Sequence, residues 1–244
     1  MPNQVAVVIP IYKEEMNDFE QKSFTQCLKV LGNHPIIIAK PVSLQLPIIA
    51  EKYPTIQFQN FPDFYFKDIA GYNQLLVSAS FYEAFLAFEY ILIYQLDAFV
   101  FEDRLQEWCE KGFDYVGSPY IDPERWTIGG KNPGNYYKNR RVILNGGFSL
   151  RKIKPIIRFL KVFKALGQSW HANEDSLLSF HYIRLLPFRP FLRLPNWQEA
   201  LDFGIEQHPQ FCYELNEKKL PFGCHAWEKY DYEFWKPFLE KNLF

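Results

Sequence analysis

The sequence lacks several features that would assign a compartment or a ligand class directly. It has no stretch of about 18 uncharged apolar residues, so we expect no membrane-spanning helix. Its start, Met-Pro-Asn-Gln, has neither the basic segment nor the apolar core of a secretion signal. Lys and Arg (27) nearly balance Asp and Glu (28), and the net charge of −1 gives no general attraction to nucleic acid. These absences favour a soluble, cytoplasmic protein that has no nucleic-acid partner.

Paired cysteines and glycine-rich phosphate loops are also missing. The four cysteines lie far apart and form neither a CxxC pair nor a zinc-site spacing, which favours reduced structural thiols. Neither GxGxxG nor GxxxxGK(S/T) follows the first apolar segment, so a dinucleotide fingerprint and a P-loop are both excluded.

What is present is an alternation of apolar strands and amphipathic helices. With 244 residues, 48% of them hydrophobic, the chain can build one large α/β domain. The first expected elements are a strand at 4–12, a helix at 17–31, a strand at 35–39, a helix at 43–53 and a strand at 56–58. This β-α-β-α-β order is typical of a parallel sheet with right-handed crossovers.

The remaining chain continues the pattern with one long irregular segment. The later expected elements are a helix at 71–89, a central strand at 90–101, a helix at 102–111, strands at 115–119 and 142–150, and a helix at 153–166. Residues 120–141 are rich in glycine, proline and aromatic residues, and loops of this length are usually functional lids or locally disordered.

The central apolar run carries a single carboxylate, Asp97, two residues after Gln95. A run of this kind is typical of a strand buried on both faces. An isolated carboxylate there costs several kcal/mol to desolvate unless it has a partner or reaches a cleft. Because the cleft of an open α/β sheet lies beyond the carboxyl ends of its strands, we expect Asp97 to be a ligand group. The structural alternative is a turn cap or a partner of a buried arginine.

Two glycine-containing segments are further candidates. Asn145, Gly146 and Gly147 interrupt the apolar strand, which indicates either a bulge that needs positive φ or backbone left bare for a sugar or phosphate. His225 lies in the turn at 221–227. Together with Asp97 it could share a Mn²⁺ or Mg²⁺ ion that faces a phosphate. The alternative for His225 is a packed, hydrogen-bonded histidine.

An acidic pair, Glu174 and Asp175, follows Asn173. Asn173 is a good N-cap, and acids in a first helical turn stabilise the helix dipole by about 0.3–1 kcal/mol. The functional interpretation is that one of the two carboxylates is a general base facing the cleft. Both interpretations can hold at once, since a first-turn acid can face a ligand.

A basic stripe follows the helix expected at 153–166. Lys154, Arg158, Lys161 and Lys164 share its outer side. Such a stripe is most often a solvated face, and the alternative is attachment to anionic lipid. The segment 184–193 mixes basic and apolar residues and supports either interpretation.

Taken together, an ordered set of motifs resembles the GT-A glycosyltransferases, and more narrowly a largely uncharacterised bacterial group from surface-polysaccharide (LPS or capsule) gene clusters. The matching segments are VVIPIY at 7–12, GYN at 71–73, IYQLDAFVF at 93–101, DYVGSP at 114–119, NGGFSLR at 145–151, the acidic pair at 174–175 and FGCHAW at 222–227. They span most of the chain in a consistent order.

The resemblance implies a single GT-A (Rossmann-like) α/β domain over 1–244, with a central mixed, mostly parallel sheet flanked by helices. Residues 1–118 would form the nucleotide-binding half and 119–244 the acceptor and catalytic half. The implied nucleotide-sugar ligands are Pro10, Tyr12, Tyr72, Asn73, Gln95, Asp97, Asn145, Gly146 and Gly147. Glu174 or Asp175 would supply the base of an inverting reaction, and Asp97 and His225 would hold a divalent cation.

One departure from the resembled pattern concerns the metal. Where GT-A enzymes carry Asp-x-Asp, this sequence reads Asp97-Ala98-Phe99, so the second carboxylate is missing. Either another group completes a Mn²⁺ or Mg²⁺ site, or the protein works without metal.

The hypothesis from the sequence is a cytoplasmic glycosyltransferase that moves a sugar from a nucleotide-diphosphate sugar to a hydroxyl of a surface glycan. The acceptor is a glycan or a lipid-linked glycan, with peripheral contact with the inner membrane surface as a further expectation. Basic side chains of the 120–141 loop (Arg125, Lys131, Lys138, Arg140) would face the departing diphosphate. The alternatives are a non-catalytic nucleotide- or glycan-binding module on the same fold, and a nucleotidyltransferase.

Overall fold

A six-stranded sheet forms the middle of the computed structural model, which describes residues 4–126, 137, 142–181 and 192–243. Its strands are β1 (Val5–Pro10), β2 (Ile36–Pro41), β3 (Gln57–Phe61), β4 (Tyr90–Tyr94), β6 (Tyr115–Pro119) and β7 (Leu144–Lys152). The order is β3-β2-β1-β4-β7-β6, and only β7 runs antiparallel to its neighbours. The expected mixed, mostly parallel sheet is therefore confirmed.

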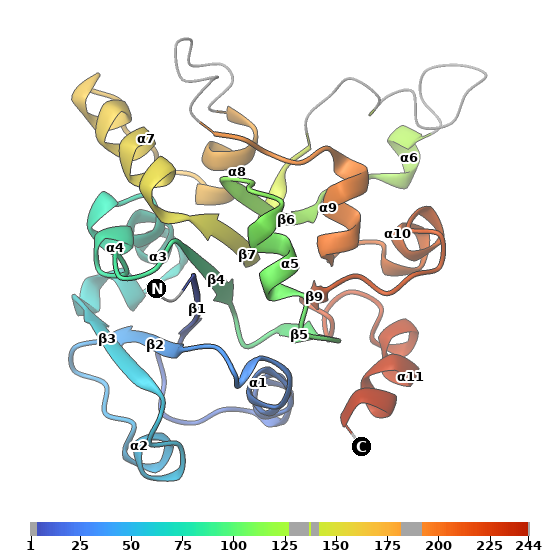
Figure 1. Cartoon of the computed structure of the whole chain (residues 1–244), viewed down its shortest axis with the longest axis horizontal. Helices are drawn as coiled ribbons and strands as arrows, with labels where there is room; N and C mark the ends of the chain where they lie inside the picture. The colour runs from blue at the N-terminus through green and yellow to red at the C-terminus, as the bar shows by residue number, and fades with distance from the viewer. Residues whose placement is uncertain (1–3, 127–136, 138–141, 182–191, 244) are drawn as a thin grey trace.

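Helices cover both faces of this sheet and fill the carboxyl-terminal part of the chain (Figure 1). They are α1 (Asp18–Leu31), α2 (Pro47–Lys52), the 3-10 helix η1 (Asp63–Phe66), α3 (Ile69–Leu76), α4 (Ala79–Glu83), α5 (Leu105–Glu110), α6 (Pro123–Trp126), α7 (Ile153–Ala165), α8 (Glu174–Ser179), α9 (Trp197–Phe203), α10 (Pro209–Leu215) and α11 (Tyr232–Leu243). The helix expected at 43–53 is shorter, because it begins only at Pro47.

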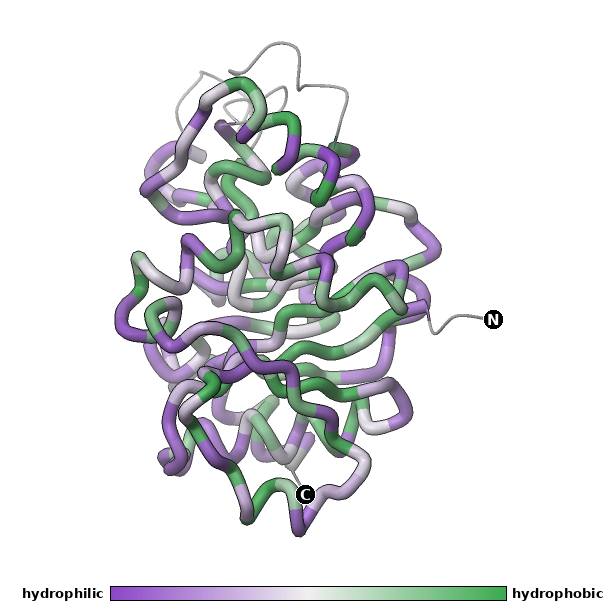
Figure 2. Tube along the Cα trace, turned by 90° about the vertical axis from the view of Figure 1, so that its left-hand side faces the viewer, coloured by the Kyte–Doolittle hydropathy of each residue, from purple (hydrophilic) through white to green (hydrophobic). Residues whose placement is uncertain are grey.

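Alternate residues of the central strands enter two separate cores. In β1, Ala6 and Val8 pack with α3, α4 and α7, whereas Val5 and Val7 pack with α1 and α5. This is the two-face burial that a continuous apolar strand predicts. Figure 2 shows the same layering, with hydrophobic stretches through the middle of the molecule and hydrophilic ones toward its outside.

The strand expected at 90–101 is in fact two strands, and the expectation of one continuous element was wrong. β4 ends at Tyr94, the chain turns at residues 95–97, and β5 (Ala98–Val100) joins a second sheet with β9 (Gly223–His225) and β8 (Gly204–Ile205). The turn is closed by the N–H of Ala98, which donates to the Gln95 carbonyl at 2.9 Å. Asp97 therefore lies in a junction between two sheets.

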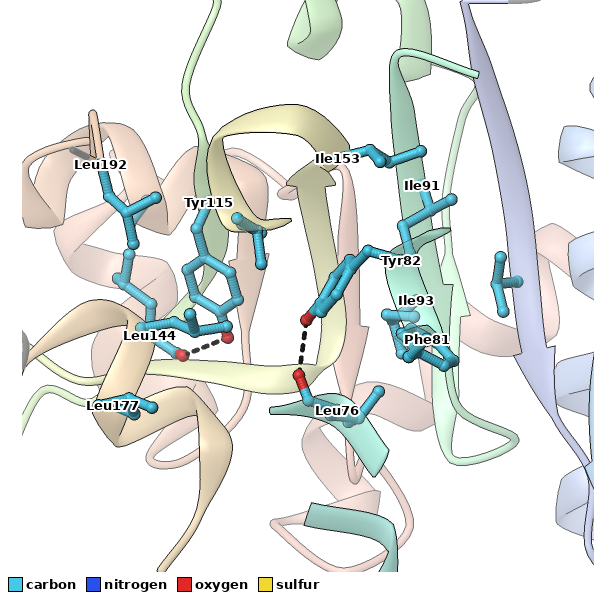
Figure 3. Close-up of a cluster of buried hydrophobic side chains, with 14 of the residues drawn as sticks. Leu76, Phe81, Tyr82, Ile91, Ile93, Tyr115, Leu144, Ile153, Leu177 and Leu192 are labelled. Atoms are coloured by element: carbon cyan, nitrogen blue, oxygen red, sulfur yellow. Dashed lines mark hydrogen bonds between the residues drawn. The ribbon is translucent and has the colours of Figure 1, made fainter. Parts of the chain in front are cut away.

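The long helix expected at 71–89 is also divided. Ser78 separates α3 from α4. Its hydroxyl donates to the Leu75 carbonyl of α3 at 2.7 Å and, as the N-cap of α4, accepts the N–H of Phe81 at 3.3 Å. The Tyr82 hydroxyl, which Figure 3 shows directed at the Leu76 carbonyl, donates to that oxygen at 2.9 Å. Leu86, near the end of the helix expected at 71–89, is 51% exposed.

Candidate active site

The carboxyl ends of β1 and β4 meet the beginning of β7 at one edge of the large sheet. β1 and β4 are the neighbours at which the strand order reverses, the position where open α/β sheets bind ligands. The N–H of Gln95 donates to the Gly147 carbonyl at 2.9 Å, which fixes the 95–97 turn against β7. The Tyr72 hydroxyl of α3 is hydrogen-bonded to the Gln95 side chain.

His225 joins this turn to the second sheet through both of its ring nitrogens. Nε2 lies 3.0 Å from Asp97 Oδ1 and 3.2 Å from Gln95 Oε1, and Nδ1 lies 3.2 Å from Glu206 Oε1. The ring is buried, with 6% of the residue exposed. Its position follows from sheet pairing, because His225 is the direct partner of Ala98 on β5. The predicted proximity of Asp97 and His225 is thus present in the structure.

The two flanking carboxylates dominate the charge state of His225. Burial opposes protonation, but Asp97 and Glu206 together raise the pKa of His225 to about 10. The ring is therefore an imidazolium at neutral pH. Because this folded pKa lies above the ordinary value of 6.5, the pair contributes stability that is complete below about pH 6.5 and is lost as pH rises through about 10.

We expect the substitution Glu206→Gln to lower the pKa of His225, since one of the two carboxylates that stabilise the imidazolium is removed. NMR titration of the His225 ring carbons gives the pKa directly. The matched control is Glu214→Gln, whose carboxylate instead pairs with Lys218. An unchanged His225 pKa in the Glu206 variant would refute the assigned contact.

Gly146 and Gly147 are required because neighbouring side chains occupy the space that a Cβ would need. The expected positive φ is wrong, since among the described glycines only Gly112 and Gly167 have one. A Cβ on Gly147 would stand 2.0 Å from His225 Nε2, and one on Gly146 would stand 2.1 Å from Glu174 Oε1. The bulge itself is present, since the β6–β7 register shifts between Gly117 and Pro119. Because these two glycines have no side chains, Glu174 can pack against Gly146 and His225 against Gly147.

Gly147→Ala is accordingly expected to destabilise the fold by about 1–3 kcal/mol and to displace His225. Chemical denaturation measures the first effect, and ligand-induced thermal stabilisation measures the second. Gly167→Ala is the control: its φ of +69° makes an alanine cost about 1–2 kcal/mol, but no atom of the site is near. Equal ligand responses in both variants would contradict the packing role of Gly147.

Behind the glycines lies a buried ion pair that the sequence did not reveal. The guanidinium of Arg151 is fully buried and donates to Glu174 Oε1 at 2.8 Å and to the Gly146 carbonyl at 3.0 Å. It also donates to the Ser149 hydroxyl and the Tyr82 hydroxyl, both at 2.9 Å. Glu174 is thus held by a neutralising partner and braces the backbone of β7.

Asp175, the other member of the acidic pair, has no ion pair among the described residues. Burial and the charge of Glu174 raise the pKa of Asp175 to about 7, and its Oδ1 accepts the Ser176 hydroxyl at 3.3 Å. A carboxyl group with a pKa near 7 exchanges protons readily at physiological pH. The two acids therefore have different surroundings, which favour a structural role for Glu174 and proton transfer for Asp175.

The start of α8 is capped by a residue from another helix. Asn173 occupies the N-cap position without a side-chain cap, contrary to expectation. Instead, Asn73 of α3 accepts the N–H of Glu174 at 3.3 Å and donates to the Asn173 side chain at 3.4 Å. Asn73 and its neighbour Tyr72 thereby join α3 to both parts of the site.

The other predicted ligand residues lie around the same sheet edge. Tyr12, just beyond β1, is 60% exposed, whereas Pro10 is buried within the strand. Asn145 accepts the N–H of Gly147 at 2.7 Å. Lys131, Lys138 and Arg140 lie outside the described residues; Arg125 pairs with Asp122 at 3.2 Å in α6.

The site offers few ligands for a divalent ion. Across the described ranges, no three His, Cys, Asp or Glu side chains converge in a way that could hold one. Phe99, in place of the second carboxylate, is fully buried. Asp97 Oδ1 and His225 Nε2 lie 3.0 Å apart, and Glu206 holds the far nitrogen as in many metal sites. Because His225 is an imidazolium at neutral pH, it must lose a proton before Nε2 can bind a cation. The Asp97 carboxylate could hold a Mg²⁺ ion whose remaining ligands come from phosphate and water, because Mg²⁺ is usually bound through one or two carboxylates.

A cavity of about 590 Å³ lies between α6, α10 and the segment after β9. Phe211 and Tyr230 give it aromatic walls, and Gln210, Lys229 and Asp231 give it polar groups. Lys229 is close enough to Asp97 to help lower the pKa of that carboxyl. Lys229 thus links this cavity to Asp97 electrostatically.

Two comparisons concern sequence alone. The model of a family described as "Protein of unknown function (DUF5672)" matches residues 55–225. No curated protein matches the chain.

Comparison of the fold with solved structures identifies glycosyltransferases. The bifunctional glycosyltransferase WbbM is 14% identical with a TM-score of 0.56, covering 100% of this chain and 50% of that one. The galactosyltransferase LgtC, solved with donor and acceptor sugar analogues, is 11% identical with a TM-score of 0.55, covering 97% and 95%. GlyE of Streptococcus pneumoniae TIGR4 is 12% identical with a TM-score of 0.51, covering 98% and 62%. The chain thus spans half of WbbM, and these likenesses show that it has the GT-A fold.

Proposed function

Because the chain belongs to the DUF5672 family of proteins of unknown function and has the GT-A fold, we propose that it is a glycosyltransferase. It transfers a sugar from a nucleotide-diphosphate sugar to a hydroxyl of a surface-glycan acceptor, such as lipopolysaccharide or capsule, on the cytoplasmic side. The observation that carries this proposal is the packing at the switch point of the sheet, where His225, the partner of Asp97, lies against Gly147 and Glu174 lies against the adjacent Gly146. Asp175, next to Glu174 in the chain, has a pKa of about 7.

In an inverting transfer, Asp175 acts as the general base. Its carboxylate takes the proton of the acceptor hydroxyl while that oxygen attacks the anomeric carbon, and the bond from this carbon to the diphosphate breaks. The buried Arg151–Glu174 pair holds the start of α8 against β7 and keeps Asp175 in place. Burial, together with the negative charge of Glu174, keeps the pKa of Asp175 high enough for proton transfer.

The donor occupies the edge formed by β1, β4 and the start of β7. Tyr12 offers an exposed ring to the nucleotide base. Asn145 offers a half-buried amide to the sugar, and Gly146 and Gly147 make room for the side chains of Glu174 and His225 beside it. Asp97 would hold a divalent cation, with His225 as a second ligand once it has lost its proton, and this cation would supply positive charge to the departing diphosphate. Lys229 adds a cation on the same side.

The cavity of about 590 Å³ is assigned to the acceptor. Its volume falls within the 300–1,000 Å³ that small-molecule sites usually have. Aromatic walls with a few polar groups suit a sugar ring, which presents apolar faces and a hydroxyl edge.

Thermal shift against a panel of nucleotide sugars and free nucleotides, each with Mn²⁺ and with EDTA, tests the donor assignment. A donor at a hundred times its Kd is expected to add about 2.7 kcal/mol of stability. A Mn²⁺-dependent shift with one nucleotide family supports donor and cation together, and a shift that survives EDTA supports the donor without the cation. No shift with any nucleotide would refute the proposed function.

A non-catalytic nucleotide- or glycan-binding module is the second candidate. Phe99 favours it, because this buried ring takes the place of a carboxylate that catalytic GT-A sites carry. Ligand-induced stabilisation without any turnover of the same donor would support the module and exclude the transferase.

A further inference from the structure

A groove on the side of the molecule formed by α4 and α7 is independent of the site just described. Its volume is about 430 Å³, and Leu86, Ile157 and Val162 give it apolar walls. Leu86 is 51% exposed, and Leu166, one residue past the end of α7, is 53% exposed. Figure 1 shows α4 beside α7 at the outside of the molecule.

Cations surround this apolar groove. Lys154, Arg158 and Lys161 line it, at successive turns of α7, and Lys164 continues the row. All four side chains are exposed. The groove has one carboxylate, Glu83, which pairs with Lys161 at 2.6 Å. A protein with a net charge of −1 thus concentrates positive charge on one helix, close to the exposed side chains of Leu86 and Leu166.

The packing of α7 limits how this surface can bind. Its apolar side, Ile153, Ile156, Phe159, Leu160 and Phe163, is buried in the core. The helix therefore cannot turn that side into a bilayer without unfolding. Only the exposed basic side chains of α7 and the groove are available for binding, so a ligand docks on the outer side of a helix that stays folded.

We propose that the α4–α7 surface docks on a membrane that carries anionic phospholipid. The four cations bind lipid phosphates, and the groove with Leu86 and Leu166 takes the apolar part of the interface. An acidic protein would match the cations but has no need of an apolar groove, and uncharged lipid would offer no negative charge to the row of basic side chains. A bilayer with anionic headgroups satisfies both features, with roughly 1 kcal/mol, or about fivefold in affinity, for each basic side chain.

Co-sedimentation of the full chain with vesicles tests this proposal without any donor or transfer assay. We expect binding to phosphatidylcholine vesicles that contain phosphatidylglycerol, no binding to pure phosphatidylcholine, and loss of binding at high salt. The triple variant Lys154→Gln, Lys161→Gln, Lys164→Gln is expected to bind about 100-fold more weakly. Leu86→Ser is expected to weaken binding while leaving its salt dependence unchanged.

The matched control is Lys67→Gln, Lys218→Gln, Lys236→Gln, which removes the same charge from exposed lysines elsewhere. It is expected to bind like the wild type. Equal losses in both triple variants would overturn the proposal by showing that only net charge matters. Failure of the wild-type protein to bind anionic vesicles, or equal binding to uncharged ones, would also overturn it. A nucleotide-induced thermal shift in the same preparation distinguishes that failure from failure of the proposed transferase.

Discussion

Asp175→Asn is expected to lower the transfer rate by roughly 10²–10⁴-fold, the usual contribution of a general base. The wild-type rate should rise with pH through about 7, as Asp175 loses its proton, and then level off. This dependence should disappear in the variant, whose amide cannot accept the proton. Steady-state rates measured across this pH range give both results.

The stability of the same variant separates a catalytic role from a structural one. The folded pKa of Asp175, about 7, lies above its ordinary 3.8, so the carboxyl costs stability as pH rises from about 4 to about 7. Above pH 7 the asparagine variant should therefore be at least as stable as the wild type. Asp18→Asn, in the first turn of α1, is the control and should keep full activity. Turnover within tenfold of wild type would refute the assignment of Asp175.

Arg151→Met is expected to destabilise the fold by about 3–5 kcal/mol. The substitution leaves Glu174 buried without its counter-ion, and an uncompensated buried charge is expensive. It also removes the donors to the Ser149 and Tyr82 hydroxyls. For a chain of this size, each kcal/mol of lost stability lowers the melting temperature by roughly 2–4 °C, so the melting temperature should fall by about 6–20 °C.

The double variant Arg151→Met, Glu174→Met checks the cause of that loss. Removing both charges should recover a large part of the stability, because no lone charge remains in the core. Arg125→Met breaks the partly exposed pair with Asp122 and should cost at most about 1 kcal/mol. Equal small losses for Arg151 and Arg125 would contradict the structural importance of the buried pair.

Local patterns predicted most of the amino-terminal half. The strands β1 to β3 and helix α1 follow from apolar runs and amphipathic spacing within about 15 residues. The break between β4 and β5 could not be predicted, because both strands are apolar and the partner of β5 is β9, more than a hundred residues away. The division of the 71–89 helix had a local signal, Ser78 as an N-cap, but amphipathic spacing on both sides of it hid the break.

The candidate site shows the same limit. Asp97, His225 and the acidic pair stand out as polar groups in apolar or glycine-containing segments, and the structure brings Asp97 and His225 together. Arg151 and Glu206 were missed, since their roles come from contacts with Glu174 and His225 that only the fold creates. Local spacing also could not distinguish Glu174 from Asp175, because the distinction depends on the buried guanidinium.

NMR-monitored consumption of a nucleotide-sugar panel, with the wild type and the Asp175→Asn variant in parallel, tests the central claim most directly. We expect the wild type to convert one family of donors to nucleoside diphosphate in the presence of a glycan acceptor. We expect at least a hundredfold slower conversion by the variant, which still binds the donor. Binding of a donor by both proteins with conversion by neither would contradict the claim that this protein is a glycosyltransferase.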